Sequence, residues 1–430
     1  MFHAPKSTCA SAAVLIACAA GIIAQCALAA EKTDAADTAA TTSAAVSALA
    51  AKQPKTAVKT RDLSDDAWRR TVVAAGTPEI YQGHPTTLLM PDGKTIYCVW
   101  STGHGGPSGS AAVSVDGGLS WKRIDERFPK AFSSHVDCPS IYALKGPDGK
   151  ERLWVWSAYR MPTGQEKAAA GGGWDGFVRA RMANAMPSVM SEDGGLTWRE
   201  FPPLGGEFAC IMAFCGVERL KDGSYLGVFH RNPEGRDRSP LTVWKSRTKD
   251  GGFTWEKPEM ICDVPGRDPC EPTLLRSPDG NELCCLMRSN KGKGRSLMMF
   301  SRDEGRSWTP AVDASAGLSG HRHVAARLKD GRYFVAFRSF ARGMGYFTAW
   351  IGSYEALRAG SDEGAVRLLL LRQHKGGDSE TRKYWKGDLG YPGVSVLPDG
   401  TVVAVTYAQL SDGDDLRSVV AVRLLPEDLR

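Results

Sequence analysis

The sequence lacks the features that mark several large classes of protein. Apart from one stretch near its start, no run approaches the roughly 20 apolar residues that a membrane-spanning helix needs. Lysine and arginine are scattered among acidic residues, so the formal charge of +6 gives no basic patch, and we expect no nucleic-acid partner. No CxxC pair occurs, which excludes a common zinc-binding pattern, and we expect neither a metal nor another cofactor.

The N-terminal residues contain few aromatic side chains. Residues 30–60 contain no aromatic residue and are rich in Ala, Thr, Lys and Asp, so we expect a disordered linker there. Residues 1–29 combine a weakly basic start, an apolar run and small residues near Ala29, which is typical of a signal peptide. We therefore expect export to the periplasm or the cell exterior, and a mature domain over residues 61–430.

Cysteine is scarce beyond the predicted signal peptide. The eight remaining cysteines form an even number, which permits disulfides in an exported protein, with Cys262 and Cys270 as a reasonable local pair. The alternative is that they pack as small apolar side chains, because several lie in strand-like runs.

The remaining composition, 42% hydrophobic and 24% charged over 430 residues, is that of a globular protein. Helical periodicity is hard to find, whereas turn signals recur. One repeat is Ser/Thr-x-Asp-x-Gly-x-Ser/Thr-Trp, found as SVDGGLSW (114–121), SEDGGLTW (191–198), TKDGGFTW (248–255) and SRDEGRSW (301–308). It predicts a hairpin tip in which the Asp caps its own turn and Gly supplies a positive φ.

A second repeat is an apolar strand, an Asp-Gly turn and another apolar strand. Its six copies have their aspartates 56, 74, 57, 51 and 69 residues apart, at Asp92, Asp148, Asp222, Asp279, Asp330 and Asp399. Each interval fits one four-stranded blade with its loops, so the chain is predicted to be an all-β, six-bladed β-propeller. Residues that flank these paired strands are expected to converge on one central funnel.

Polar residues recur at those flanking positions. The strand beginnings contain GHP, HVDCP, PCEP, GHRH and DLGYP, and the strand exits contain FHR, MRS and FRS. Here the sequence resembles the sialidase superfamily. The four Asp-containing repeats resemble its Asp-box, a structural marker for which we expect no catalytic role. PCEPTLLRSPDGNELCCLMRSN (269–290) and LGYPGVSVLPDGTVVAVTY (389–407) resemble the segments that carry a sialidase's catalytic Glu and nucleophilic Tyr.

The resemblance implies a glycan substrate and a role for each matching residue. Tyr391 would attack the anomeric carbon and Glu271 would be its base, because a neutral Tyr avoids repulsion by the carboxylate of a sialoside. Arg288 and Arg338, with Arg231 as a third candidate, would clamp that carboxylate. In each arginine the alternative role is pairing with a neighbouring acid, and Tyr391 could instead be a core tyrosine.

The sequence departs from the family in the first blade. Sialidases open that blade with an Arg, where this chain has Gln82 and His84, and the loop 101–110 has no acid, only His104. Either the chain is a divergent sialidase in which Asp137 supplies the acid and His84 helps to hold the substrate, or the propeller cleaves a different sugar. In the second case the acid and base are some combination of Asp137, Glu271, His84, His321 and His323.

His321, Arg322 and His323 form a dense cluster at another strand start. Strand alternation places the two histidines on one face and Arg322 on the other, so either set could face the channel. We count all three as candidate substrate-binding residues. A metal site from His84, His321 and His323 is an alternative that we do not predict, because its ligands would have to meet from separate blades.

The leading hypothesis is an exported glycoside hydrolase that releases terminal sialic acid or a related acidic sugar. The alternatives are a glycan-binding propeller without activity, and a hydrolase of another glycan, such as an arabinan.

Overall fold

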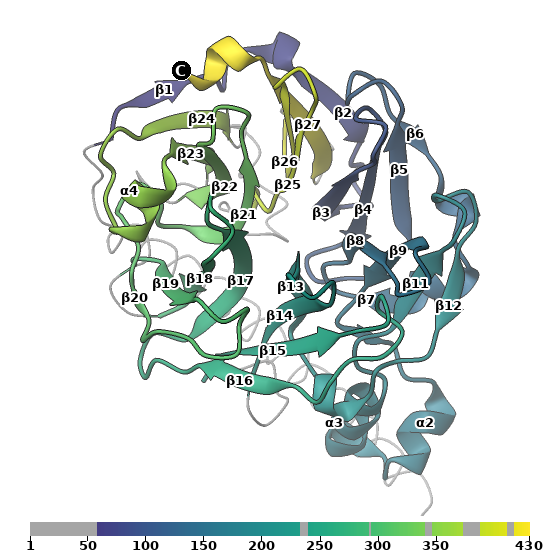
Figure 1. The fold of residues 1–430 in the computed structure, drawn as a ribbon. Helices are drawn as coiled ribbons and strands as arrows, with labels where there is room; N and C mark the ends of the chain where they lie inside the picture. Colours follow the sequence, from purple (N-terminus) through teal and green to yellow (C-terminus); the bar gives the residue numbers. More distant parts are fainter. Residues whose placement is uncertain (1–57, 233–239, 292–293, 340–345, 373–387, 411–416) are drawn as a thin grey trace, which may run out of the picture. The chain divides into compact units, whose positions relative to one another are not determined.

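In the described part of the chain, six sheets of four or five strands are arranged around a common centre, and one two-stranded sheet accompanies them (Figure 1). The computed structural model describes residues 58–232, 240–291, 294–339, 346–372, 388–410 and 417–430. The predicted signal peptide and most of the predicted linker lie outside these residues. Each of the six larger sheets is one blade, which confirms the predicted six-bladed β-propeller.

The first three blades follow one another along the chain. Blade 1 contains β3 (Gln82–Leu89), β4 (Ile96–Thr102), β5 (Ser110–Ser114) and β6 (Lys122–Arg123). Blade 2 contains β8 (Ser140–Lys145), β9 (Glu151–Trp156), β11 (Ser188–Ser191) and β12 (Arg199–Phe201). Blade 3 contains β13 (Met212–Arg219), β14 (Tyr225–Arg231), β15 (Thr242–Thr248) and β16 (Glu259–Cys262).

Blades 4 to 6 follow along the chain. N-terminal strands join the last two, as the fifth strand of blade 5 and the fourth strand of blade 6. Blade 4 contains β17 (Pro269–Arg276), β18 (Leu283–Ser289), β19 (Leu297–Ser301) and β20 (Val312–Asp313). Blade 5 contains β21 (His321–Arg327), β22 (Tyr333–Ser339), β23 (Tyr346–Gly352) and β24 (Val366–Arg372), with β1 (Thr60–Asp62) parallel to β24. Blade 6 contains β25 (Gly393–Val396), β26 (Val402–Ala408) and β27 (Ser418–Leu424), with β2 (Arg70–Ala74) antiparallel to β27. The N-terminal strand β2 therefore closes the ring by joining the last blade.

A few elements lie outside the blades. Strands β7 (His135–Val136) and β10 (Tyr159–Arg160) pair with each other. Helices α2 (Gly164–Ala169) and α3 (Gly173–Ala183) are inserted between β10 and β11, and α4 (Tyr354–Arg358) follows β23. Short 3-10 helices cover Ala67–Arg69, Asp125–Arg127, Lys130–Ser134, Gly206–Phe208 and Pro426–Leu429. Within the described ranges, no helix combines the length and hydrophobicity required to cross a bilayer.

Both sequence repeats have the predicted structures. Each of the six Asp-Gly turns joins the first and second strand of a blade, and each of the four Asp-boxes joins the third and fourth. In the box at Asp193, the carboxylate accepts hydrogen bonds from the Thr197 amide (3.0 Å) and hydroxyl (2.6 Å), so it caps its own turn. These bonds are local, which explains why the turn is encoded by eight contiguous residues.

The Asp-box turns also join neighbouring blades. The Tyr97 hydroxyl of blade 1 donates to the Gly194 carbonyl in the box of blade 2 (2.7 Å), and the Trp154 indole of blade 2 donates to Gly251 in the box of blade 3 (2.9 Å). The Lys245 ammonium of blade 3 makes the same contact with blade 4. The boxes are therefore structural, as the sequence predicted.

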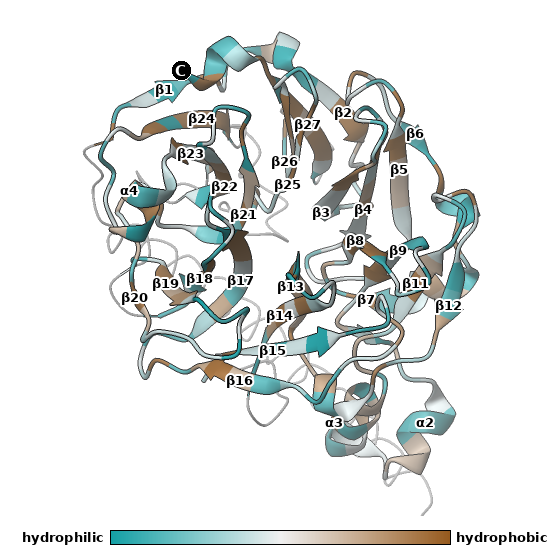
Figure 2. Cartoon of the chain, in the orientation of Figure 1, coloured by the Kyte–Doolittle hydropathy of each residue, from teal (hydrophilic) through white to brown (hydrophobic). Residues whose placement is uncertain are grey.

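The hydrophobic core is divided among the spaces between blades. Separate clusters of buried side chains lie between blades 1 and 2, 2 and 3, 4 and 5, and 5 and 6. Figure 2 shows the same pattern as hydrophobic strands joined by more hydrophilic turns. All eight cysteines outside the predicted signal peptide are buried free thiols, so they follow the packing alternative and Cys262 is not bonded to Cys270.

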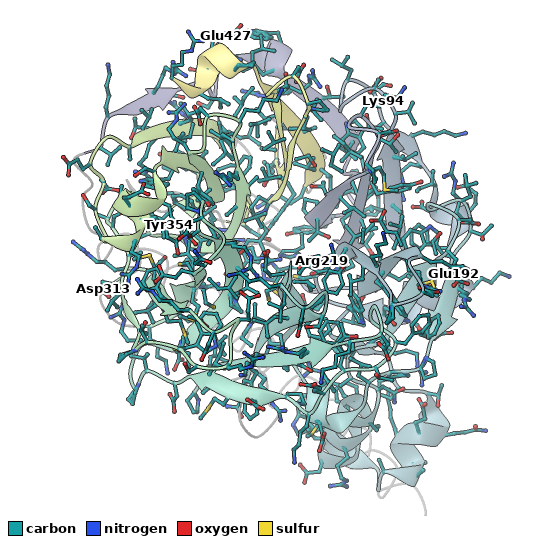
Figure 3. The ribbon with its side chains drawn as sticks, in the orientation of Figure 1. Lys94, Glu192, Arg219, Asp313, Tyr354 and Glu427 are labelled. Atoms are coloured by element: carbon teal, nitrogen blue, oxygen red, sulfur yellow. The ribbon has the colours of Figure 1, made fainter. Side chains whose placement is uncertain are left out.

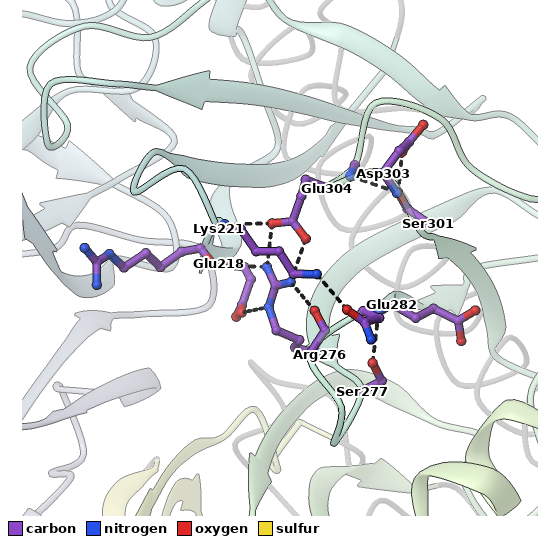
Figure 4. A network of polar contacts seen from close by, with 12 residues as sticks. Glu218, Lys221, Arg276, Ser277, Glu282, Ser301, Asp303 and Glu304 are labelled. Carbon is purple, nitrogen blue, oxygen red and sulfur yellow. Dashed lines mark hydrogen bonds and ion pairs between the residues drawn. The ribbon is translucent and has the colours of Figure 1, made fainter.

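Charged side chains outside the centre also connect blades. Arg276 of blade 4 donates to Glu218 of blade 3 (2.9 Å) and to Glu304 of the blade 4 Asp-box (2.8 Å), as Figure 4 shows. Other charged residues lie at the periphery, among them the labelled Lys94 and Glu192 (Figure 3). These ion pairs therefore lie away from the centre of the propeller and stabilise contacts between blades.

Candidate functional site

The side chains of the site come from irregular positions at the starts of the inner strands. Strands β3, β17 and β21 each contain a β-bulge, and in each bulge one non-glycine residue has a positive φ: His84 (57°), Glu271 (50°) and Arg322 (50°). Asp137, just before β8, has a φ of 68°. A bulge changes the direction of a side chain, and such strain persists mainly at functional sites. Equivalent distortions thus mark four blades.

Tyr391, Glu271 and Arg288 form the centre of the cluster. The Tyr391 hydroxyl donates to Glu271 Oε1. Arg288 Nη1 donates to the same Glu271 oxygen (2.8 Å) and to the Tyr391 hydroxyl oxygen (3.1 Å), while its Nη2 donates to Asn290 Oδ1 (2.6 Å). The structure therefore joins the predicted nucleophile, base and first clamp arginine, from blades 4 and 6.

Arg338 lies on the other side of Tyr391. Its guanidinium carbon is 4.2 Å from the centre of the Tyr391 ring, close enough for a cation–π contact. Its Nε donates to the Leu389 carbonyl (2.5 Å) and its Nη2 to the Tyr407 hydroxyl (2.8 Å). Tyr391 is thus bordered by two guanidinium groups, of which that of Arg338 is buried and that of Arg288 is partly buried.

A second carboxylate, Asp388, organises the part of the cluster near blade 1. Asp388 accepts hydrogen bonds from the hydroxyls of Tyr407 (2.8 Å) and Tyr81 (2.9 Å), and its Oδ1 lies 3.0 Å from His104 Nδ1. Arg338 Nη2 is 3.9 Å from the same oxygen. Asp388 is almost fully buried, at 1% exposure, yet it is surrounded by donors and a cation, which makes its charge tolerable.

His84 connects the two carboxylate centres. Its Nε2 lies 3.2 Å from the Tyr407 hydroxyl, and its ring centre lies 4.8 Å from that of His104 and 5.2 Å from that of Tyr391. Burial lowers the pKa of His84 to about 3, and the neighbouring His104 acts in the same direction. His84 is therefore a neutral imidazole at ordinary pH.

The charge state of the central pair follows from its surroundings. Burial by itself raises the pKa of Glu271, but the Arg288 charge and the Tyr391 hydrogen bond outweigh burial and bring the pKa to about 2. Burial and then the Glu271 carboxylate raise the pKa of Tyr391 well above its ordinary range. The resting pair is therefore an ionised carboxylate and a neutral phenol.

On the blade 1 side of the cluster, His104 and Asp388 favour each other's charged forms. Burial lowers the pKa of His104, but the Asp388 carboxylate outweighs burial and raises the pKa above the ordinary 6.5. Burial would raise the pKa of Asp388, yet His104, His84 and Arg338 hold it far below its usual range. His104 is therefore the histidine of this cluster whose protonated form is favoured by its surroundings.

Several polar atoms of the cluster have no protein partner. Among the described residues, Glu271 Oε2, Arg288 Nε and His84 Nδ1 are buried without a hydrogen bond. Buried polar groups in proteins are normally paired, and exceptions call for a specific explanation such as a ligand. Their three residues all contact or border Tyr391, so these atoms are candidate contacts for a polar ligand.

The other predicted site residues have different surroundings. Asp137 lies beside the loop of His104, since a side chain at Gly105 would come within 3.5 Å of its Oδ1. Gln82 accepts a hydrogen bond from the Trp100 indole (2.6 Å), and Arg231 donates to the Glu207 carbonyl (2.7 Å). The latter two side chains thus support their own blades.

The alternation predicted for residues 321–323 is wrong, because the bulge in β21 interrupts it. Arg322 reaches blade 3, where its Nη1 donates to the Cys215 carbonyl (3.0 Å). His323 Nε2 lies 2.9 Å from the Leu318 carbonyl of its own blade. Burial is the largest cause of the lowered pKa of His321, and the nearby charges of Arg288 and Arg338 lower it further. The two histidines therefore have different surroundings.

Three groups are near enough to be considered as metal ligands. One ligand atom each from His84, His104 and Asp388 lies within 4.8 Å of the others. The set differs from the one weighed on the sequence, and Arg338, 3.9 Å from the Asp388 oxygen, opposes a further cation there. The donor set therefore fits the internal network better than a metal ion.

Sequence reasoning missed Asp388 and Tyr407 and gave His104 no role. Asp388 begins the DLGYP segment (388–392) before the first strand of the last blade. Tyr407 lies in the TYA segment (406–408) at the exit of its second strand. Their position at a strand beginning and a strand exit was the available signal.

The blades, the Asp-boxes and the cluster around Tyr391 define a six-bladed β-propeller of the sialidase superfamily. Residues 168–403, more than half of the 430, match the BNR repeat-like domain, and the chain belongs to that family. A search of curated protein sequences gave no match.

Solved structures have the same fold at low sequence identity. A protein of unknown function from Dyadobacter fermentans is 16% identical, with a TM-score of 0.59 over 82% of this chain and 98% of that one. The intramolecular trans-sialidase of Ruminococcus gnavus, in complex with oseltamivir carboxylate, is 14% identical, with a TM-score of 0.51 over 84% and 97%. The endosialidase of phage phi92 is 11% identical, with a TM-score of 0.53 over 83% and 69%.

Proposed function

We propose that the protein is a glycoside hydrolase in which Tyr391 attacks the anomeric carbon and Glu271 receives its proton. The observation that carries this proposal is the hydrogen bond from the Tyr391 hydroxyl to a buried, ionised Glu271 that Arg288 also contacts. A neutral tyrosine is a weak nucleophile, and an adjacent carboxylate base activates it. Arg288 supports the same assignment, because it contacts both the Glu271 carboxylate and the Tyr391 hydroxyl oxygen.

The proposed substrate is a terminal sialic acid or a related acidic sugar on a glycan. Arg288 and Arg338 support an anionic sugar, because both guanidinium groups border Tyr391. The buried Arg288 Nε, which has no partner within the described residues, is available for a substrate oxygen. The acidic sugar released by hydrolysis would then depart from a position between the guanidinium groups of Arg288 and Arg338.

A hydrolase of a neutral glycan is the second candidate. The observation that favours it is Asp388, whose Oδ1 lies 3.9 Å from Arg338 Nη2 and supplies an internal anion. Glu271 similarly accompanies Arg288. The two arginines are thus balanced by two carboxylates, which reduces the attraction for a substrate carboxylate.

The proposed location is the periplasm or the cell exterior, where glycan substrates are accessible. The basic, apolar and small-residue pattern of residues 1–29 supports export. Mass spectrometry of the protein from a culture would test it, since the mature chain should begin near residue 30.

The test is hydrolysis of an aryl α-sialoside, an aryl arabinoside and an aryl galactoside by the purified mature protein. We expect turnover of one glycoside, with Tyr391→Phe and Glu271→Gln each lowering kcat/KM by about 100-fold or more. Tyr333→Phe is the matched control, because its hydroxyl donates to the Arg276 carbonyl outside the cluster. Near-normal turnover by either site variant would disprove the mechanism, and the cleaved glycoside distinguishes the two substrate classes.

A further inference from the structure

His104 and Asp388 form a pair that the Tyr391 mechanism leaves unused. His104 lies in the loop after β4 and its side chain is 53% exposed, whereas Asp388 is 1% exposed. Because Asp388 is ionised, the ring nitrogen Nδ1 of His104 must carry the proton of their 3.0 Å hydrogen bond. Within the described chain, no hydrogen bond engages His104 Nε2. The buried carboxylate thus fixes the ring and leaves its second nitrogen for an external partner.

The pair lies beside the reacting centre. The His84 ring is 4.8 Å from His104 on one side and 5.2 Å from Tyr391 on the other, so the three rings form a row. His84 is buried and its Nε2 contacts Tyr407, which makes it a spacer rather than a proton carrier. His104 is the exposed end of this row.

The charged groups that face His104 come from four parts of the chain. Asp388 contacts it directly, Asp137 lies against its loop, the neutral His84 ring lies 4.8 Å from its ring, and Arg338 is the nearby cation. Burial and the Arg338 charge disfavour the protonated imidazole, while Asp388 and Asp137 favour it and prevail. The direct hydrogen bond makes Asp388 the strongest of the favourable contacts.

We propose that His104 is the general acid and base of the hydrolysis, with Asp388 as its positioning residue. This inference rests on the proposed function. In the first step the Tyr391 oxygen bonds to the anomeric carbon and its proton passes to Glu271. The glycosidic C–O bond breaks, and the departing oxygen takes the Nε2 proton of His104.

The second step restores every group. Neutral His104 takes a proton from water as the water oxygen bonds to the anomeric carbon. The bond from that carbon to the Tyr391 oxygen breaks, and the oxygen recovers its proton from Glu271. Two protons move in each step, and no oxidant or further reactant is needed. Asp388 stays ionised throughout and holds the imidazole in one orientation.

The experiment compares a 4-nitrophenyl glycoside with the methyl glycoside of the same sugar, using the sugar that the wild-type protein cleaves. Nitrophenolate leaves without a proton, whereas methanol leaves only with one. We expect His104→Gln to lower kcat/KM on the methyl glycoside by about 100-fold or more, and on the nitrophenyl glycoside by less than about 10-fold. Asp137→Asn, measured in parallel at a pH well below the alkaline limb, where His104 stays protonated, should affect both substrates alike.

The pH profile tests the positioning role of Asp388. The wild-type rate on the methyl glycoside should fall as pH rises above 6.5, because the acid form of His104 is lost. Asp388→Asn should move this alkaline limb to lower pH, and His104→Gln should abolish it. In an NMR titration of the imidazole, Asp388→Asn should likewise lower the pKa of His104.

The outcomes separate the two proposals. If wild type cleaves a glycoside and Tyr391→Phe does not, but His104→Gln loses activity equally on both leaving groups, the His104 role alone is wrong. The same holds if Asp137→Asn shows the leaving-group dependence, or if His104 titrates below 6.5. If wild type cleaves none of the glycosides, the proposed function is wrong and the catalytic role of His104 with it.

Discussion

At the scale of single residues, the site consists of charges that stabilise one another. Glu271 is buried, and burial alone would favour its neutral form. Arg288 reverses this preference through a 2.8 Å contact, and the resulting carboxylate accepts the Tyr391 proton. Arg288 therefore keeps Glu271, the proposed base, ionised and also contacts the Tyr391 hydroxyl.

Replacing Arg288 should change the pH dependence of catalysis. Arg288→Ala removes the charge that most lowers the Glu271 pKa, so this pKa should rise from about 2 by more than one unit. The acidic limb of kcat/KM should move to higher pH by the same amount. Arg276→Ala is the control, because it breaks the blade-joining contacts of Figure 4 without touching Glu271. An unmoved acidic limb in Arg288→Ala would contradict this account.

At the scale of elements, the β-bulge in each of three inner strands strains one residue and changes the direction of its side chain. His84, Glu271 and Arg322 occupy equivalent positions in three blades with φ near 50° to 57°. A left-handed conformation costs a non-glycine residue about 1–2 kcal/mol. Regular strands would instead alternate their side chains between the two faces of the sheet.

Two substitutions at His84 should reveal this strain. His84→Ala and His84→Gly both remove the imidazole, but only glycine adopts a φ of 57° without a steric penalty. His84→Gly should be the more stable variant by about 0.5–1 kcal/mol in urea unfolding, after allowance for the greater freedom of unfolded glycine. The same pair at Thr87, in the regular part of β3, should show the reverse order. If alanine is the more stable at both positions, the bulge is not strained.

At the scale of the whole molecule, contacts between blades hold the propeller together and isolate several histidines from water. His84, His135, His321 and His323 are buried in blades 1, 2 and 5 or beside them. Burial lowers the pKa of His84 to about 3 and those of His135 and His323 to about 4. Burial is also the largest cause of the lowered pKa of His321.

The buried histidines should make the fold sensitive to mild acid. Between pH 6.5 and 4 they bind protons in the unfolded chain but not in the native one, so stability falls with falling pH. Each contributes about 1.4 kcal/mol per pH unit in that window. Urea unfolding at several pH values measures the slope, and His135→Phe should reduce it by one histidine's share. His104→Gln should not, since His104 is protonated in both states there. A flat profile would contradict the buried neutral histidines.

The sequence alone was sufficient for the fold and for part of the site. Asp-boxes and Asp-Gly turns are fixed by hydrogen bonds within a few residues, as between Asp193 and Thr197, so the blade count is visible in the printed sequence. Tyr391, Glu271 and Arg288 lie within short motifs at blade ends, and the structure brings these three together. The signal peptide and the substrate stay predictions.

Only the tertiary structure decided how the blades combine their side chains. The bulge at Arg322 interrupts the strand alternation expected for residues 321–323. One extra residue in a strand shifts which face of the sheet each following side chain occupies relative to the partner strand. His104 and Asp388 are 284 residues apart, and no local pattern relates them. Closure of the ring brings blade 6 beside blade 1. Asp388 is buried there and hydrogen-bonds the exposed imidazole of His104. Local turns are determined by neighbouring residues, whereas this pair exists only because the propeller closes.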